Sequence, residues 1–267
     1  MELSHCAHKD RCGVCRMNVS LNELQSVCRK AFLGMGFAAG HADDAAAMVT
    51  WLQSHGLQGL SVLTENMACV TAATSRQRPQ IVFEDDGLAV VDGQNLSVLA
   101  SGNLAMELAY TKASKQGFAV VRMQQCRQRQ LIIGYLSRLA GRGINVTACW
   151  RHSQSPLLEQ VVNFRAGSTV PSITVTTVSE PVSVDATHDD LTVFMAKHVE
   201  LMPETTVQGQ HALQYCHDEA ELMSARQAAL QQGMTVSPDV WDQLKAYAAL
   251  TLVEASEASR TGAGPSE

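Results

Sequence analysis

The stretch LAVVDGQNLSVLASGNLAMELAYTKASKQGFAVV, residues 88–121, decides the fold class of this chain. It begins with an apolar strand, continues through a helix that Ser101-Gly102-Asn103 starts and Gly117 ends, and closes on a second apolar strand. A helix over Leu131–Ala140 and a strand over Ile144–Trp150 are expected to follow. Alternating strands and helices of these lengths predict an α/β fold whose mixed sheet contains βαβ units.

Helices are expected ahead of this segment. In the first, the capping box Ser20-x-x-Glu23 precedes apolar residues that share one face, and Gly34 marks the end. A second helix is predicted over His41–His55 and a third over Leu60–Thr74. The N-terminal part of the chain is therefore expected to be helical.

The remaining segments predict a less regular pattern. Expected strands are Ile81–Phe83, Ser172–Val178 and Leu191–Met195, and expected helices are Pro156–Phe164, Asp218–Gln231 and a segment from Ser237-Pro238 to Leu252. We expect one α/β domain over residues 17–254, between a disordered leader, residues 1–16, and a flexible tail, residues 255–267.

The composition is that of an ordinary globular protein. Apolar residues make up 46% of the 267 residues and charged residues 17%, which excludes wholesale disorder. The formal charge of −6 gives no broad attraction to nucleic acid, and no apolar run approaches the roughly 20 residues of a membrane helix. The polar N-terminus lacks a secretory signal, and eight cysteines are too few for a disulfide scaffold, which predicts a cytoplasmic protein.

Residues 1–16 differ from the rest of the chain. Cys6, His8, Cys12 and Cys15 form a C-x-H-x3-C-x2-C cluster whose side chains suit zinc. The segment has almost no apolar residues to pack around a metal, and Met17 comes just before the first capped helix. We therefore expect a disordered leader without a metal site, and a zinc-dependent module is the weaker alternative.

Several common catalytic motifs are missing. The turn after Val91 reads Asp92-Gly93-Gln94-Asn95, which is not the G-x-G-x-x-G phosphate turn of a Rossmann fold. The chain also lacks a Walker A lysine, a G-x-S-x-G elbow and an H-E-x-x-H pair. The commonest NTPase, hydrolase and metalloprotease functions are therefore excluded.

Short motifs follow one another in a set order between residues 19 and 150. Over about half of the chain, this order resembles the N-terminal half of the malate/L-lactate dehydrogenase-like oxidoreductases. The resemblance implies their non-Rossmann NAD(P)-binding fold and a homodimer. The motifs that carry it are Ser20-Leu21-Asn22-Glu23, Gly34-Met35-Gly36, Ala45-Ala46-Ala47, Val91-Asp92-Gly93, Ala105-Met106-Glu107-Leu108-Ala109 and Gly117-Phe118-Ala119-Val120-Val121.

The catalytic motifs of that family have no counterparts here. The family carries Arg-Gly-x-Asp-Ser-His-Gly after its second helix, where this chain has Gln58–Leu63 without a histidine. The family's catalytic His-Phe-Gly is replaced by Gln124–Gln130, and its Lys-Gly segment is not visible. Ser54-His55-Gly56 comes too early in the sequence, and we expect His55 to end a helix as an imidazolium that favours the helix dipole.

Without these histidines, hydride transfer to a 2-keto acid lacks its usual proton donor, and the catalytic residues are unknown. Arginine and glutamine do not exchange protons near neutral pH. We expect Arg127, Gln128 and Arg129 to bind an anion such as a carboxylate or phosphate, and a solvated polar turn is the alternative.

Both ends of the chain resemble an uncharacterised bacterial family of about this length. The resemblance rests on Ser20-Leu21-Asn22-Glu23, Arg29-Lys30-Ala31 and the closing stretch, residues 256–264. Ser259, Arg260 and Gly262 are candidates for a backbone nest that binds an anion beside a guanidinium, and a frayed terminus is the alternative.

These observations predict a small-molecule-binding or regulatory relative of the dehydrogenases that lacks their catalytic histidines. Its expected ligand is a small anionic metabolite or a nucleotide, with NAD(P) implied by the resemblance alone. The alternative is an active NAD(P)-dependent reductase of small keto or imino acids with a non-standard proton donor. We expect neither nucleic acid nor a membrane as a partner.

Overall fold

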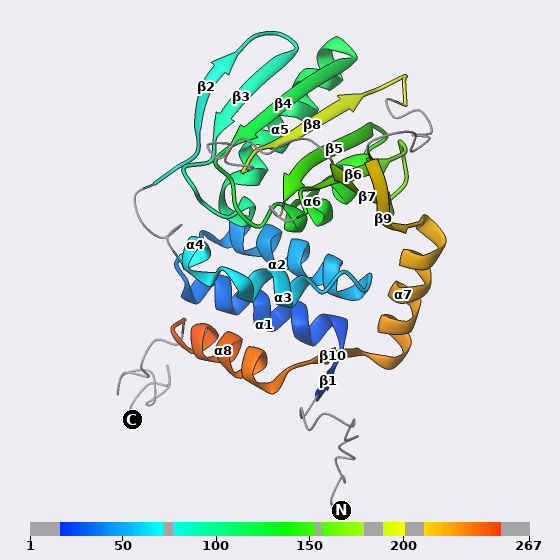
Figure 1. Ribbon diagram of the computed structural model, residues 1–267. Helices are drawn as coiled ribbons and strands as arrows, with labels where there is room; N and C mark the ends of the chain where they lie inside the picture. Colours follow the sequence, from blue (N-terminus) through cyan, green and yellow to red (C-terminus); the bar gives the residue numbers. More distant parts are fainter. Residues whose placement is uncertain (1–16, 72–76, 153–155, 179–188, 201–210, 252–267) are drawn as a thin grey trace, which may run out of the picture.

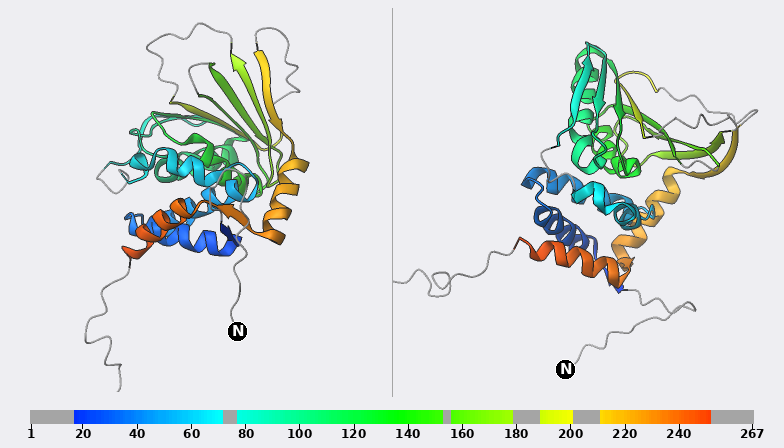
Figure 2. Two further views of the ribbon diagram at one scale, coloured as in Figure 1. Left: turned by 60° about the horizontal axis from the view of Figure 1, so that its bottom comes forward. Right: turned by 60° about the vertical axis from the view of Figure 1, so that its left-hand side comes forward.

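The computed structural model describes residues 17–71, 77–152, 156–178, 189–200 and 211–251, and both the predicted leader and the whole of the predicted tail lie outside these ranges. The described residues form a layer of helices against an eight-stranded sheet (Figure 1). In both views of Figure 2, helices α1, α2 and α8 lie on one side of the sheet, and α7 runs from the sheet to this layer. None of the described helices has both the length and the apolar character that crossing a lipid bilayer requires.

The helical layer begins as the sequence predicts. The Ser20 hydroxyl accepts a hydrogen bond from the Glu23 amide (3.2 Å), and the buried face of α1 is formed by Leu24, Cys28, Ala31 and Phe32. The short strands β1 and β10 pair with each other in antiparallel fashion, which joins the start of α1 to the segment before α8. The elements are β1 (Met17–Val19), α1 (Leu21–Gly34), α2 (Ala39–Ser54), α3 (Gly59–Glu65), α4 (Met67–Thr71), α7 (Glu219–Gln232), β10 (Met234–Val236) and α8 (Pro238–Ala249).

The predicted third helix is two short helices. Gln58 adopts a left-handed conformation (φ 53°) before α3, and Asn66 (φ −142°, ψ 60°) breaks the helical path between α3 and α4. Residues 72–74 of the predicted helix lie outside the described ranges. The break gives α3 a free C-terminal end that carries Glu65.

The large sheet is mixed, and its strand order is β2-β3-β4-β8-β5-β6-β7-β9. Helix α5 (Val98–Gln116) connects β3 to its parallel neighbour β4, so the predicted βαβ unit is confirmed. The strands are β2 (Gln80–Glu84), β3 (Leu88–Asp92), β4 (Phe118–Gln124), β5 (Asn145–His152), β6 (Leu158–Phe164), β7 (Ser172–Val178), β8 (Leu191–Ala196) and β9 (His211–His217).

A later segment separates the next two strands of the predicted pattern. A single 3-10 turn (Arg129–Leu131) and α6 (Ile132–Ala140) lead from β4 to β5. Strand β8 lies between β4 and β5 and is antiparallel to both, so these two strands run in the same direction without pairing. Local periodicity contains no signal for such an insertion, because β8 follows β5 by about 40 residues of sequence.

One predicted element and one predicted helix start differ from the structure. The helix expected over Pro156–Phe164 is wrong, because Leu158–Phe164 forms strand β6, in which Val162 and Phe164 are buried and Val161 and Asn163 only half-buried. That alternation has the period of two of a strand. Helix α5 begins at Val98 with Ser97 as its N-cap, so Ser101 lies buried within the helix rather than starting it.

Helix α2 packs closely against its neighbours because two facing positions are glycines. A Cβ atom at Gly134 of α6 would lie 2.8 Å from Met48 Cα, and one at Gly59 of α3 would lie 2.3 Å from the Val49 carbonyl oxygen. Real Cβ atoms do not come this close to backbone, so both glycines are required for the contact.

We expect Gly134→Ala to lower the free energy of unfolding by roughly 1–3 kcal/mol, because the added methyl pushes α6 away from α2. Gly40→Ala is the matched control, since a Cβ atom at Gly40 has open space within 4 Å. Urea unfolding followed by circular dichroism measures both. Equal stability of the two variants would contradict the close contact.

Candidate functional sites

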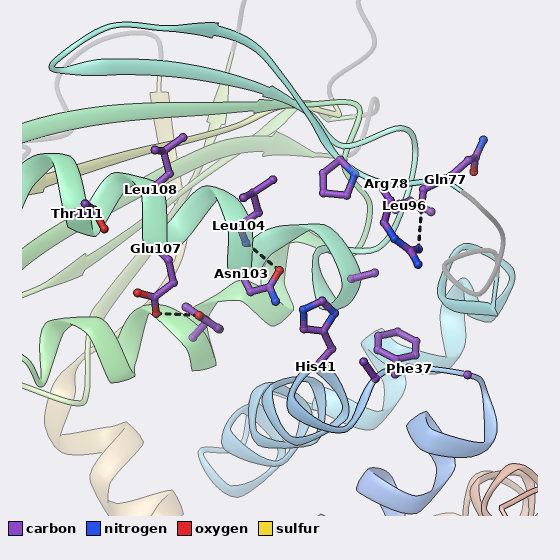
Figure 3. A pocket seen from close by; sticks show the side chains of 15 residues that line it. Phe37, His41, Gln77, Arg78, Leu96, Asn103, Leu104, Glu107, Leu108 and Thr111 are labelled. Carbon is purple, nitrogen blue, oxygen red and sulfur yellow. Dashed lines mark hydrogen bonds between the residues drawn. The ribbon is translucent and has the colours of Figure 1, made fainter.

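The larger candidate site is a cavity of about 810 Å³ between the N-terminus of α2 and one side of α5 (Figure 3). Residues 77–79, which precede β2, close it on a third side. The floor is mostly apolar and is formed by Phe37, Leu96, Ala100, Leu104 and Leu108. A cavity of this size and character is typical of sites for metabolites and cofactors.

One end of this cavity is electrostatically positive. The N-cap residue of α2, Ala38, makes no side-chain hydrogen bond, so the first amides of the helix lack a side-chain acceptor. His41 in the first turn and Arg78 lie at the same end (Figure 3). The positive end of the helix dipole adds to the charge of Arg78 and favours an anionic group.

At the opposite end of the cavity lies Glu107, the one carboxylate among the described lining residues, and it is already paired. The Tyr135 hydroxyl donates to Glu107 Oε1 (2.9 Å), and Arg142 Nη1 lies 3.3 Å from Glu107 Oε2. Burial and the hydrogen bond to Glu107 raise the pKa of Tyr135, so its hydroxyl keeps its proton. The described part of the cavity therefore has a positive end and a neutralised end.

The predicted loop Arg127-Gln128-Arg129 does not line this cavity. Arg127 forms an ion pair with Asp189 (2.6 Å) and donates to Asn95 Oδ1 (3.1 Å). The Arg129 side chain is only 11% exposed and lies 3.8 Å from the same carboxylate, and burial lowers its pKa. Asp189, just before β8, therefore offsets much of the loop's positive charge.

Gln128 has a left-handed backbone (φ 53°) and connects the loop to α3. Its Nε2 donates to the carbonyl oxygens of Val62 and Leu63, each at 2.8 Å, and its Oε1 is buried without a partner in the described part of the chain. These contacts give the loop a structural role. The anion-binding role of Arg127, Gln128 and Arg129 stays a prediction.

Two other predicted features lie outside the described ranges. These are the closing nest of Ser259, Arg260 and Gly262, and the leader cluster Cys6, His8, Cys12 and Cys15. Within the ranges that are described, no three His, Cys, Asp or Glu side chains gather as metal ligands would.

His55 ends α2 as expected, but its predicted charge is wrong. The residue is 2% exposed, its ring stacks on Trp51 with centroids 3.8 Å apart, and its Nδ1 donates to the Trp51 carbonyl oxygen (2.6 Å). Burial lowers its pKa from 6.5 to about 4, so the imidazole is neutral at pH 7. No imidazolium is present there to interact with the helix dipole.

His152 lies at the end of β5, and the sequence did not predict it as a site residue. Burial, and to a lesser extent Arg129, lowers its pKa, and its Nε2 is buried without a hydrogen-bond partner among the described residues. The only sequence signal was its place just after the predicted strand Ile144–Trp150. Nearby, burial raises the pKa of Cys126 to about 12, which keeps that thiol protonated.

The fold is that of malate/lactate dehydrogenase-like enzymes. A dehydrogenase from Sinorhizobium meliloti matches with a TM-score of 0.61 at 12% identity, covering 88% of this chain and 100% of that one. A putative malate/lactate dehydrogenase from E. coli matches with a TM-score of 0.57 at 13% identity, covering 92% of this chain and 98% of that one. A delta1-piperideine-2-carboxylate reductase from Pseudomonas syringae pvar. tomato matches with a TM-score of 0.57 at 11% identity, covering 86% of this chain and 99% of that one. At these identities the likeness shows the fold.

By sequence, residues 19–101 match a family described as "Protein of unknown function (DUF3726)". The match covers α1 to the start of α5 and includes the N-terminus of α2. No curated protein sequence matches the chain. The two predicted resemblances, to the dehydrogenases in fold and to an uncharacterised family in sequence, are confirmed over these spans.

We expect His55 to make stability depend on pH. Unfolded histidine, with a pKa of 6.5, gains a proton between pH 7 and 5, whereas folded His55, with a pKa of about 4, does not. The unfolded state then binds more protons, so the free energy of unfolding falls by roughly 2 kcal/mol between pH 7 and 5.

Urea unfolding of the wild type and of His55→Gln at both pH values measures this contribution, and we expect the fall to be absent from His55→Gln. His41→Gln, at an exposed position of the same helix, is the control, and its free energy of unfolding is expected to fall as in the wild type. An equal pH slope in wild type and His55→Gln would contradict the burial of a neutral His55.

Proposed function

We propose that the protein binds a small anionic metabolite or a nucleotide in the cavity between α2 and α5, without the histidine chemistry of a dehydrogenase. The observation that carries this proposal is the cavity itself, which combines a positive end at the start of α2 with an apolar floor. A ligand with an anionic group at the helix N-terminus and a flat apolar body over Leu104 and Leu108 fits both the positive end and the apolar floor.

NAD(P), which the resemblance implies, has these two features, since its phosphates are anionic and its rings are flat. The volume of about 810 Å³ suits a large part of such a cofactor. In this arrangement the first amides of α2, His41 and Arg78 hold a phosphate, and Leu104 contacts a ring. When bound, the cofactor supplies hydride, and this chain's residues bind and orient it.

A binding or regulatory role fits the groups near the Gln124–Gln130 segment. Cys126 and Tyr135 keep their protons because burial raises both pKa values, and Gln128 exchanges none. Arg127 and Arg129 of the predicted loop do not exchange protons near neutral pH either. The homodimer and the cytoplasmic location also stay predictions.

Fluorescence titration of the purified protein with NADH and NADPH tests the proposal. We expect binding of at least one nucleotide with a dissociation constant below about 0.1 mM. Ala100→Trp, which fills the cavity, is expected to weaken binding at least about tenfold. Ala166→Trp, at an exposed position outside the cavity, is the control. Absence of binding at millimolar nucleotide, or unchanged binding by Ala100→Trp, would contradict the proposal.

The second candidate function is reduction of a small keto or imino acid with His152 as the unusual proton donor. The observation that favours it is the buried, unpartnered Nε2 of His152 close to the predicted loop and Arg129. An imino substrate reduces the demand on the protein, because its nitrogen can already carry the proton.

We expect no NADH oxidation with pyruvate, oxaloacetate or delta1-piperideine-2-carboxylate, since the lowered pKa leaves His152 without a proton at neutral pH. Absorbance of NADH at saturating substrate measures this. Oxidation by the wild type that His152→Gln abolishes, while His198→Gln at an exposed position outside both candidate sites retains it, would establish the reductase instead.

A further inference from the structure

A second recess, of about 360 Å³, lies between α3 and the distal strands of the sheet. Two cross-strand rows form its floor. Gln160 pairs with Val175 and Val175 with Tyr215, while Val162 pairs with Ile173 and Ile173 with His217. Directly paired residues point to the same face of a sheet, so Gln160, Ile173, Tyr215 and His217 all face the helices.

The side chain of Gln160 is the main feature that points to a ligand in this recess. Gln160 is 3% exposed as a whole residue, it lines the recess, and no hydrogen bond joins its side chain to another described residue. Its amide atoms are not among the buried polar atoms that lack a partner, so the amide is open to the recess. It can therefore donate to and accept from a molecule that enters there.

The roof of the recess supplies further unpaired polar groups. Ser61 and Glu65 project from successive turns of α3, Gln58 lies in the left-handed turn before it, and Gln130 lies in the 3-10 turn. None of these four side chains is hydrogen-bonded to another described residue. Together with Tyr215, the recess offers several donors and acceptors around a small volume.

The charge of the recess excludes a typical keto acid. Among its described lining residues there is no lysine or arginine, and Glu65 is the carboxylate. His217 lies 3.1 Å from a carboxylate oxygen of Glu221, so a second negative group is near. The turn after α2, including Gly56, also presents the negative end of that helix's dipole.

We infer that this recess binds a small, hydroxyl-rich molecule that carries a positively charged amino group. The three glutamine amides and the hydroxyls of Ser61 and Tyr215 bind its hydroxyl groups, and Glu65 binds its ammonium. The ring of Tyr215 offers an apolar face to the ligand body. This site is separate from the cavity between α2 and α5 and does not depend on the function proposed for that cavity.

Calorimetric titration of the full chain with three matched sugars tests this inference. Glucosamine, glucose and glucuronate have the same ring but differ in charge. At pH 6.5 we expect glucosamine to bind with a dissociation constant of about 1 mM, and glucuronate to bind at least about tenfold more weakly. No binding of glucosamine up to about 50 mM, or equal binding of glucuronate, would overturn the proposal.

Variants then locate the site. Gln160→Leu is expected to weaken glucosamine binding at least about tenfold, because it removes the central amide. Glu65→Gln, at an exposed position that does not endanger folding, is expected to reduce glucosamine to the affinity of glucose. Glu23→Gln, which removes an exposed carboxylate of α1, is the matched control. Wild-type affinity for glucosamine in Glu65→Gln would overturn the assignment.

Discussion

The close packing of α2 is the constraint on which the rest of the structure depends. Glycines at positions 59 and 134 let α3 and α6 approach the α2 backbone without intervening side chains, and α1 packs on another side. The helix has 16 residues and so spans about 24 Å. Both candidate sites lie at its ends, so its position fixes their separation and their walls.

The two ends of α2 have opposite electrostatic character, and the two sites follow this difference. At the N-terminus, amides without a side-chain cap, together with His41 and Arg78, favour an anion over an apolar floor. At the C-terminal turn, Glu65 and unpaired glutamine amides favour a neutral or positively charged polar molecule. One buried helix thereby lies between two candidate sites of opposite electrostatic character.

The segment Gln124–Gln130, where the resemblance to the dehydrogenases places their His-Phe-Gly, connects separate elements. Gln128 donates to two carbonyl oxygens of α3, and Arg127 pairs with Asp189 beside β8. Amides and arginines hold elements together well because they keep one protonation state near pH 7. Through Gln128 and Arg127, the segment therefore joins α3 to the start of β8.

The sequence by itself determined the helical N-terminus, the βαβ unit of β3, α5 and β4, and the absence of the catalytic motifs, because these are local patterns of period and cap. Only the tertiary structure decided the insertion of β8 between β4 and β5, the neutrality of His55 and the pairing of Arg127 with Asp189. It also placed Gln160 on a strand facing Ser61, Glu65 and Tyr215. These features depend on contacts between residues far apart in the chain, and no local period encodes which distant segment will meet another.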